Sequence, residues 1–374
     1  MLSPAMVATP EELVPPLLDW YRVHGRDLPW RRSPTPYRIL LSELLCQQTR
    51  IQTALPYYER FLARWPTLDD LAGASEDDVL EMWAGLGYYR RARALHAAAR
   101  AASALGGLPA TVEGLRALPG IGPYTAGAIA SIAFGEPAAA VDGNVERVLG
   151  RVDRGPELPW NAAGKRHLQR RARSLHDGRR PGDHAGDLTQ ALMELGASLC
   201  SPTTPSCQRC PLAAHCEARA HGEQDAWPRM RPRKQPVPIA AAVALVEDRG
   251  ALLFARRPPK GLLAGLWEPV MVPVPGPDDA TAGALAEGVA QRVGLSVEVG
   301  ARLGTVVHVF SHRKLTARVF AARTRGGDLS LPEQDGAYVD ARFASPGAEP
   351  PLSTLARKLV ALRDATPLLM AAEP

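Results

Sequence analysis

The segment that decides the fold is Leu118-Pro119-Gly120-Ile121-Gly122-Pro123-Tyr124-Thr125-Ala126-Gly127. Two glycines, separated by one isoleucine, stand just before an apolar run that is typical of a helix and continues through Ile132. Glycine lets backbone N–H groups approach an anion closely, and the first turn of a helix favours negative charge. Gly120 and Gly122 therefore predict either a docking point for one phosphate or only a glycine-rich turn between packed helices.

Around this segment the sequence pattern is helical. From residue 11 to about residue 220, leucine, alanine and methionine recur at steps of three and four residues, and glycine and proline mark helix ends. A chain of 374 residues exceeds one ordinary core of about 100–200 residues, so we expect two domains. The first of them is expected to be all-α.

A stretch rich in proline and arginine, residues 227–238, ends the helical pattern. Proline removes backbone donors and favours extended chain, so this stretch is predicted to be a linker. Short β-like runs and two helical stretches follow, which predicts an α+β second domain. The expected strands are 239–246, 251–256, 305–310 and 315–321, and the expected helices are 284–293 and 354–364.

The composition excludes some classes of protein. Hydrophobic residues make up 46% of the chain and charged residues 22%, which is ordinary for a globular protein. No apolar run approaches the roughly 18–20 residues of a membrane span. The first 13 residues lack the basic start and apolar stretch of a secretory signal. We therefore expect a cytoplasmic protein without a membrane partner.

The net charge of +5 is only a weak indication of a polyanionic partner. The clustering of basic residues is a stronger indication than the net charge, because ten of them lie in the segment before the cysteines. This basic run predicts either phosphate binding or a solvated helical face, and the sequence leaves both open. Its members are Arg147, Arg151, Arg154, Lys165, Arg166, Arg170, Arg171, Arg173, Arg179 and Arg180.

Four of the five cysteines fall within seventeen residues, and Cys46 stands apart. Five are too few for a disulfide scaffold in a chain of this length, so metal binding is expected. The spacing Cys-x6-Cys-x2-Cys-x5-Cys suits tetrahedral zinc or an iron–sulfur cluster, and it has one Cys-x2-Cys pair where zinc ribbons usually have two. The spacing favours the cluster, with Cys200, Cys207, Cys210 and Cys216 as ligands.

Two acidic residues are candidates for chemistry. Asp142 precedes Gly143 and Asn144, where it predicts either a carboxylate that faces a ligand or the N-cap of the next helix. Glu43 stands among leucines, so partial desolvation should raise its pKa toward neutrality and suit it to general acid catalysis.

Polar and aromatic side chains near these acids can contact nucleic acid. Gln48 and Thr49 end the expected helix of Glu43 and can hydrogen-bond base edges. Tyr88 lies in the run 86–91, which places aromatic rings next to arginines. Taken singly, such tyrosines are more often part of a core.

In this order, the elements resemble the helix-hairpin-helix DNA glycosylases with a [4Fe-4S] cluster, over roughly residues 19–217. The resemblance implies a multidomain protein, with an all-α helix-hairpin-helix glycosylase domain at 1–225, a linker at 226–237 and an α+β Nudix-like domain at 238–366. The first domain would comprise a six-helix lobe and an iron–sulfur lobe with its cluster at 200–216. In that superfamily the hairpin, here with Gly120 and Gly122, grips the DNA backbone, and Asp142 would lie at the sugar of the extruded nucleotide.

Within the superfamily, bifunctional members carry a lysine two residues after the second hairpin glycine, where this chain has Tyr124. No Schiff base forms there without that amine, so a monofunctional hydrolytic glycosylase is implied. The motifs around Glu43, Gln48, Tyr88 and Asp142 are most similar to the adenine DNA glycosylases of the MutY type, which remove adenine mispaired with 8-oxoguanine.

This family resemblance implies roles for the candidate residues. Glu43 would protonate the flipped adenine, and Asp142, kept ionised by a polar loop, would stabilise the oxocarbenium ion. Tyr124 and Asn144 would steady Asp142 and the attacking water. Gln48 and Tyr88 would occupy or buttress the gap that the flipped base leaves.

The resemblance also implies the cofactor and the partner. The cofactor is expected to be a [4Fe-4S] cluster, and the partner is duplex DNA with adenine opposite 8-oxoguanine or guanine, bound by a monomer. Gln48, Thr49 and Tyr88 would contact that DNA. The sequence Phe310-Ser311-His312 resembles the lesion-sensing loop of the family's Nudix-like domain.

Three rival functions were weighed against these features. A Nudix hydrolase is disfavoured because Gln291 and Arg292 replace its glutamate pair, and Glu287-Gly288 replaces its Arg-Glu pair, so Mg²⁺ would lack carboxylate ligands. Tyr124 disfavours a bifunctional pyrimidine glycosylase/lyase. A non-catalytic iron–sulfur DNA-binding protein remains an alternative, although such a protein would need neither Glu43 nor Asp142. The sequence does not decide between 8-oxoguanine and guanine opposite adenine.

Overall fold

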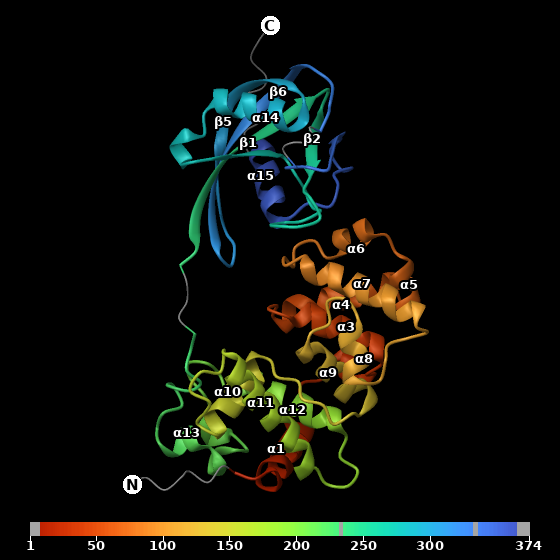
Figure 1. Ribbon diagram of the computed structural model, residues 1–374, viewed down its shortest axis with the longest axis vertical. Coiled ribbons are helices and arrows are strands. Elements are labelled where there is room, and N and C mark those ends of the chain that lie inside the picture. Colours follow the sequence, from red (N-terminus) through yellow and green to blue (C-terminus); the bar gives the residue numbers. More distant parts are fainter. Residues whose placement is uncertain (1–7, 232–234, 332–335, 365–374) are drawn as a thin grey trace. The chain divides into compact units, whose positions relative to one another are not determined.

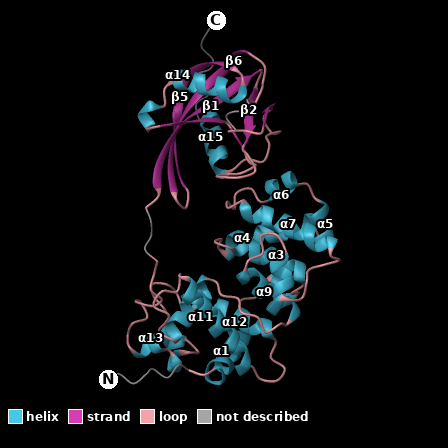
Figure 2. Ribbon diagram, in the orientation of Figure 1, coloured by secondary structure: helices cyan, strands magenta, loops and turns pink. Residues whose placement is uncertain are grey.

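The computed structural model describes residues 8–231, 235–331 and 336–364, and the chain divides into two compact units. The helical unit combines Met1–Ala74 with Arg91–Pro232, and the sheet unit combines Ser75–Arg90 with Arg233–Pro374. Figure 1 follows the chain through both units, and Figure 2 distinguishes their helices and strands. Among the described residues, no helix is both long and apolar enough to cross a membrane.

Local sequence explains where many helices begin. Proline occupies the first position of α1, α3 and α9, where a missing N–H leaves no hydrogen bond unmade. Thr35, Thr111 and Asn161 cap the helices that follow them, because each side-chain oxygen accepts a backbone N–H of the first turn. The helices are α1 (Pro10–His24), α2 (Pro29–Arg32), α3 (Pro36–Cys46), α4 (Ile51–Arg64), α5 (Leu68–Gly73), α6 (Glu76–Met82), α7 (Arg90–Ala104), α8 (Val112–Ala117), α9 (Pro123–Phe134), α10 (Gly143–Val152), α11 (Ala162–Ser174), α12 (Ala185–Ser198) and α13 (Glu217–Ala220), with 3₁₀ turns at Leu175–Gly178, Cys207–Arg209 and Ala213–His215.

The central helix of the helical unit is α9. Every residue from Thr125 to Ile132 is buried, as expected for a segment that is apolar on nearly all sides. Helices α3, α8 and α12 pack against it. Because α3 carries Glu43 and α9 carries Tyr124 in its first turn, their packing brings these two side chains together.

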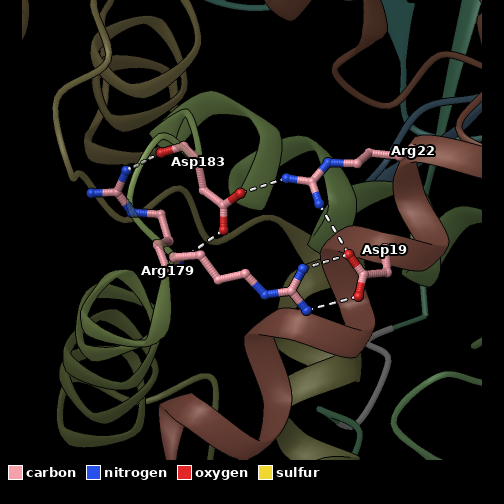
Figure 3. A network of polar contacts seen from close by, with 5 residues as sticks. Asp19, Arg22, Arg179 and Asp183 are labelled. Carbon is pink, nitrogen blue, oxygen red and sulfur yellow. Dashed lines mark hydrogen bonds and ion pairs between the residues drawn. The ribbon is translucent and has the colours of Figure 1, made fainter.

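A second core joins α1, α10 and α12, whose apolar faces form one cluster of buried side chains that includes Leu13, Leu17, Val148 and Leu195. At its edge, a polar network ties α1 to the loop before α12. Arg22 donates hydrogen bonds to Asp19 and Asp183, and Arg179 donates one to the backbone carbonyl of Asp183 (Figure 3). The N-terminal helix is thereby fastened to the helix that leads to the cysteines.

The described residues of the sheet unit form a seven-stranded sheet. Its main path runs β3-β2-β1-β6-β5, while β4 also pairs with β1 and β7 with β2. Strands β1 and β6 are parallel, and the other pairs are antiparallel. The elements are β1 (Val237–Asp248), β2 (Ala251–Arg256), β3 (Trp267–Glu268), β4 (Val270–Val274), α14 (Ala282–Val293), β5 (Ser296–Val309), β6 (Arg313–Gly326), β7 (Asp340–Ala344) and α15 (Thr354–Asp364), with a 3₁₀ turn at Pro277–Asp279.

Strand β1 is buried on both faces, which explains its nearly continuous apolar sequence. Successive side chains of a strand point to opposite faces. Val243 accordingly packs in the cluster that contains Leu355 of α15, while the next residue, Ala244, packs in the cluster that contains Val289 of α14. One helix therefore covers each face of the sheet.

The strand and helix predictions for this unit are confirmed, with differences at the ends. Strand β1 begins at Val237, inside the predicted linker, of which residues 232–234 lie outside the described residues. Strand β5 begins at Ser296 rather than at residue 305, because its first half is mostly exposed and lacks an apolar run. Strands β3, β4 and β7 were not predicted, since each has five residues or fewer.

Candidate active site

Glu43 projects from a turn of α3 that is otherwise buried, and it remains partly exposed itself. The pKa of Glu43 is raised from 4.5 to about 7, mainly by burial and also by the nearby charge of Asp142. Two neighbours oppose this rise, the hydroxyl of Tyr124 and the charge of Arg31. The result is a carboxyl group that can hold a proton close to neutral pH.

Tyr124 is the direct hydrogen-bond partner of Glu43. Its hydroxyl donates to Glu43 Oε2 at 2.5 Å. Burial and the two neighbouring acids raise the pKa of Tyr124 well above its usual range, so the phenol keeps its proton and acts as a donor. This differs from the prediction that Tyr124 steadies Asp142, because the first turn of α9 meets α3 and directs the hydroxyl to Glu43.

Asp142 is the N-cap of α10. Its Oδ1 accepts the backbone N–H groups of Asn144 and Val145 at 3.0 and 2.8 Å, and its Oδ2 accepts the side-chain amide of Asn144 at 2.8 Å. The two interpretations of Asp142 are therefore compatible, since the cap itself fixes the carboxylate beside Glu43. Burial raises the pKa of Asp142, and these hydrogen bonds oppose that rise.

A chain of hydrogen bonds leads from Asp142 to the cysteine segment. Asn144 Oδ1 accepts from Arg147 Nη2 at 2.9 Å, and Arg147 Nε donates to the backbone carbonyl of Cys200 at 2.7 Å. The same guanidinium also donates to the carbonyl of Gly196 at 2.7 Å. Sequence analysis placed Arg147 only in the basic run, although its position one turn after Asn144 on an expected helix puts both on one face.

A buried ion-pair cluster lies near Glu43 and was missed by the sequence analysis. Glu194 of α12 is 1% exposed, and it accepts from Arg26 Nε at 2.6 Å and from Arg31 Nη2 at 2.8 Å. Arg31 lies close enough to Glu43 to lower its pKa. The available indication was the position of Glu194 between Met193 and Leu195, which resembles the leucine surroundings of Glu43.

The two hairpin glycines have different structural roles. Gly120 has φ +75°, and a Cβ atom there would lie 2.5 Å from the Cβ of Ala94 in α7, so both its conformation and its packing require glycine. Gly122 is the N-cap of α9, and a Cβ atom there would meet nothing within 4 Å. Its backbone therefore leaves the N-terminus of α9 open to a partner.

The turn after α3 is held by Arg91, which is 8% exposed. Arg91 Nη1 donates to the carbonyls of Leu44 and Leu45 at 3.1 and 3.0 Å, and also to that of Gln47. The chain then passes through Gln48, which is exposed and has φ +54°. Gln48 is thus presented at the surface directly after the Glu43 helix, while the adjacent Thr49 is partly buried and donates to the Gln47 carbonyl at 3.4 Å.

All four clustered cysteines line one small cavity together with Arg151, Leu199 and Leu212. Arg151 Nη1 lies 3.3 Å from Cys200 Sγ, and backbone N–H groups of Leu212 and Arg219 bond the sulfurs of Cys210 and Cys216. Within the described ranges, no three His, Cys, Asp or Glu side chains converge as ligands of a single metal ion. The structure thus places the four cysteines that were predicted as ligands around one cavity.

The Phe310-Ser311-His312 sequence forms the turn between β5 and β6. Phe310 N donates to the Arg313 carbonyl at 2.7 Å, and the rings of His308 and Phe310 pack at 4.6 Å. Ser311 and His312 are exposed. In the same unit, the hydroxyls of Tyr88 and Ser311 lie 3.3 Å apart, so two separately predicted DNA contacts are neighbours.

Helix α14 occupies the place of a Nudix catalytic helix without its acids. Gly288 is buried, and a Cβ atom there would lie 2.5 Å from a methyl group of Val272 in β4. No carboxylate side chain fits at this point, and Gln291 and Arg292 follow it on the helix. Position 288 therefore cannot supply a carboxylate to a metal ion unless Val272 moves.

Comparison with known families matches two separate segments of the chain to two different families. Residues 41–174 match the model of the HhH-GPD superfamily base excision DNA repair protein, and residues 241–362 match that of the NUDIX domain. These matches confirm the predicted fold class, a helix-hairpin-helix domain followed by a Nudix-like domain. Among solved structures, a thermostable thymine-DNA glycosylase is 28% identical with a TM-score of 0.51, over 57% of this chain and 97% of that one.

Curated relatives extend the similarity across both units. The adenine DNA glycosylase of Homo sapiens is 38% identical over 367 residues, covering 83% of this chain and 66% of the human protein. That of Rattus norvegicus is 38% identical over 365 residues, covering 83% of this chain and 70% of the rat protein. The chain thus spans about two thirds of the length of these relatives.

Proposed function

Because the chain belongs to the adenine DNA glycosylase family, we propose that it hydrolyses the N-glycosidic bond of adenine mispaired with 8-oxoguanine or guanine in duplex DNA. The observation that carries the proposal is the pair of carboxyl groups at Glu43 and Asp142. The pKa of Glu43 is raised to about 7, while Asp142 is oriented by three hydrogen bonds. The reaction needs one protonated acid as proton donor and one ionised acid to stabilise positive charge on the sugar.

The adenine must first leave the base stack, because its glycosidic bond is inaccessible within the duplex. We place the extruded base against Glu43, with the ion-pair cluster of Arg26, Arg31 and Glu194 behind it. A purine ring has acceptors on its edges, and the two guanidinium groups carry donors, while Glu194 holds both arginines in place. Gln48, which is exposed beside α3, is suited to enter the vacated position in the duplex.

In the chemical step Glu43 donates its proton to a ring nitrogen of adenine and converts a poor leaving group into a good one. Positive charge then develops on the sugar, and the carboxylate of Asp142 stabilises it until water adds to the anomeric carbon. Tyr124 holds Glu43 in place, and Asn144 holds Asp142. With tyrosine at position 124 no amine is available there for a Schiff base, so the reaction stops at an abasic site.

We propose that Cys200, Cys207, Cys210 and Cys216 hold a [4Fe-4S] cluster. Hydrolysis of the glycosidic bond transfers no electrons, and the cluster would supply a rigid cross-link within residues 200–216. That segment carries Arg209, which is exposed and available for a phosphate. The bonds of Arg147 to Asn144 and to the Cys200 carbonyl would let the same cross-link support Asp142.

For the sheet unit we propose recognition of the base opposite adenine. Ser311 and His312 stand exposed at the β5–β6 turn, beside the hydroxyl of Tyr88. Hydroxyl and imidazole groups can hydrogen-bond the edge of 8-oxoguanine, and aromatic rings can stack on it. Gly288 in place of a Nudix carboxylate supports binding rather than hydrolysis by this unit.

The decisive experiment incubates the full chain with duplexes that hold adenine opposite 8-oxoguanine, guanine or thymine, followed by treatment with or without alkali. We expect strand cleavage only after alkali, and most of it opposite 8-oxoguanine. Cleavage without alkali, together with a borohydride-trapped adduct, would replace the proposal with a lyase. Binding without adenine release by the wild-type chain would leave only a DNA-binding protein.

A further inference from the structure

The basic run separates into two groups in the folded chain. Six of its arginines have partners within the helical unit: Arg147, Arg151, Arg154, Arg171, Arg179 and Arg180. The salt bridge of Arg180 to Asp19 and the bond of Arg179 to Asp183 belong to the network at α1 (Figure 3). The other four, Lys165, Arg166, Arg170 and Arg173, all lie on α11, and across the described residues their side chains have no hydrogen bond or ion pair.

The three unpaired arginines form one stripe on α11. Arg166, Arg170 and Arg173 follow each other at steps of four and three residues, so they share a face, and all three are exposed. Leu168 and Ala172 are buried on the opposite face. With a rise of about 1.5 Å per residue, the stripe is about 10 Å long.

This stripe differs from an ordinary solvated face. Solvated helix faces usually mix charges of both signs, whereas α11 contains no acidic residue. Arginines three and four positions apart repel one another and destabilise the helix that carries them. A bound polyanion would relieve that repulsion.

We propose that the Arg166, Arg170 and Arg173 stripe binds phosphates of the DNA strand next to the extruded nucleotide, which extends the DNA contact beyond the hairpin. Helix α11 packs against α10, whose N-cap is Asp142, and Lys165 at the start of α11 acts on the charge of Glu146 in the first turn of α10. One strand of duplex DNA carries one charge per nucleotide, so a stripe of this length can reach neighbouring phosphates of the same strand. The inference rests on the proposed function.

The test measures binding of an undamaged duplex by fluorescence anisotropy at several salt concentrations. The variant Arg166→Gln/Arg170→Gln/Arg173→Gln should lower the slope of log K against log salt by about 2 to 3, because each phosphate that an arginine neutralises contributes about 0.9 to that slope. At 0.1 M salt the affinity should fall about eightfold for each phosphate that is no longer bound. Single-turnover adenine release at saturating protein should stay at the wild-type rate.

A matched control removes three exposed arginines from β5 and β6, away from their connecting turn: Arg302→Gln/Arg323→Gln/Arg325→Gln. This control removes the same amount of charge and should keep the wild-type slope. Equal slopes in both triple variants would overturn the proposal. The proposal would also be overturned if the α11 triple variant lost binding to a poly-aspartate peptide while its duplex binding stayed at the wild-type level. That result would indicate an acidic protein partner. Failure of the wild type to release adenine would refute the proposed function and leave the slope comparison intact.

Discussion

At the residue scale, Glu43 depends on a balance of opposed influences. The surrounding leucines raise its pKa, while Tyr124 and Arg31 lower it. Glu194 neutralises part of the Arg31 charge through a 2.8 Å ion pair, which limits how far that arginine can favour the ionised form. The acidity of Glu43 therefore depends on side chains from α2, α9 and α12 as well as on its own helix.

The first prediction concerns the pH dependence of adenine release. The reaction needs the protonated form of Glu43, so the single-turnover rate should fall as pH rises through about 7. The Tyr124→Phe variant loses the hydrogen bond that lowers this pKa, so its decline should move to higher pH. Tyr58→Phe is the control, because the buried Tyr58 hydroxyl has no hydrogen-bond partner in the described residues. A Tyr124→Phe profile that moved to lower pH would contradict the assignment.

A second prediction follows for stability. The pKa of Glu43 is 4.5 without the fold and about 7 within it, so the folded state holds the proton more tightly and loses stability as pH rises through this window. Above pH 7 the cost is at most about 3 kcal/mol. Glutamine cannot donate a proton, so Glu43→Gln should abolish adenine release. Glutamine also cannot ionise, so the variant should have a higher Tm than the wild type at pH 8. The Tm difference between variant and wild type should shrink at pH 5, and an equal difference at both values would refute the linkage.

At the element scale, the hairpin between α8 and α9 depends on two glycines in different ways. Gly120 lets the turn adopt a positive φ and pass against Ala94 of α7. Gly122 instead keeps the first turn of α9 uncovered. Packing and ligand access are thus divided between neighbouring positions of one turn.

The third prediction separates these two roles by substitution. Gly120→Ala forces a methyl group to within 2.5 Å of Ala94 and a disfavoured φ, so it should lower Tm and weaken duplex binding. Gly122→Ala has room and an ordinary φ, so Tm should change little while duplex binding weakens. Thermal unfolding and fluorescence anisotropy measure the two effects. A Gly122→Ala variant with unchanged affinity would remove the α9 N-terminus from the DNA contact.

The same scale shows what the sequence alone could predict. Long periodic segments such as α14 and the apolar strand β1 were predicted, because burial imposes a repeat on their residues. Glu43 was predicted because it is an acid among leucines, whereas Asp142 equally predicted an N-cap and received its catalytic role only from the family resemblance. The Glu194 cluster and the Tyr124 bond to Glu43 could not be predicted, since both join helices distant in the chain and depend on the packing around α9.

At the scale of the whole molecule, the proposed function assigns catalysis and recognition of the opposite base to different units. The helical unit contains both candidate acids and the cysteine cavity, and the sheet unit presents the β5–β6 turn. The Nudix-like unit lacks the Nudix glutamate pair on α14, but its strands β5 and β6 are long, and the turn that joins them lies at their end. Selectivity for the opposite base can therefore change without altering the chemical step.

The last prediction tests this separation with the variant Ser311→Ala/His312→Ala. Each hydrogen bond from these exposed side chains to the lesion is worth about 1 kcal/mol, so preference for adenine opposite 8-oxoguanine over guanine should fall about tenfold or more. Adenine release opposite guanine should stay at the wild-type rate, because Glu43 and Asp142 are untouched. Ser345→Ala, an exposed serine directly after β7, is the control and should keep the preference. An equal loss of rate on both duplexes would mean that the turn supports the fold or general DNA binding rather than recognition of the lesion.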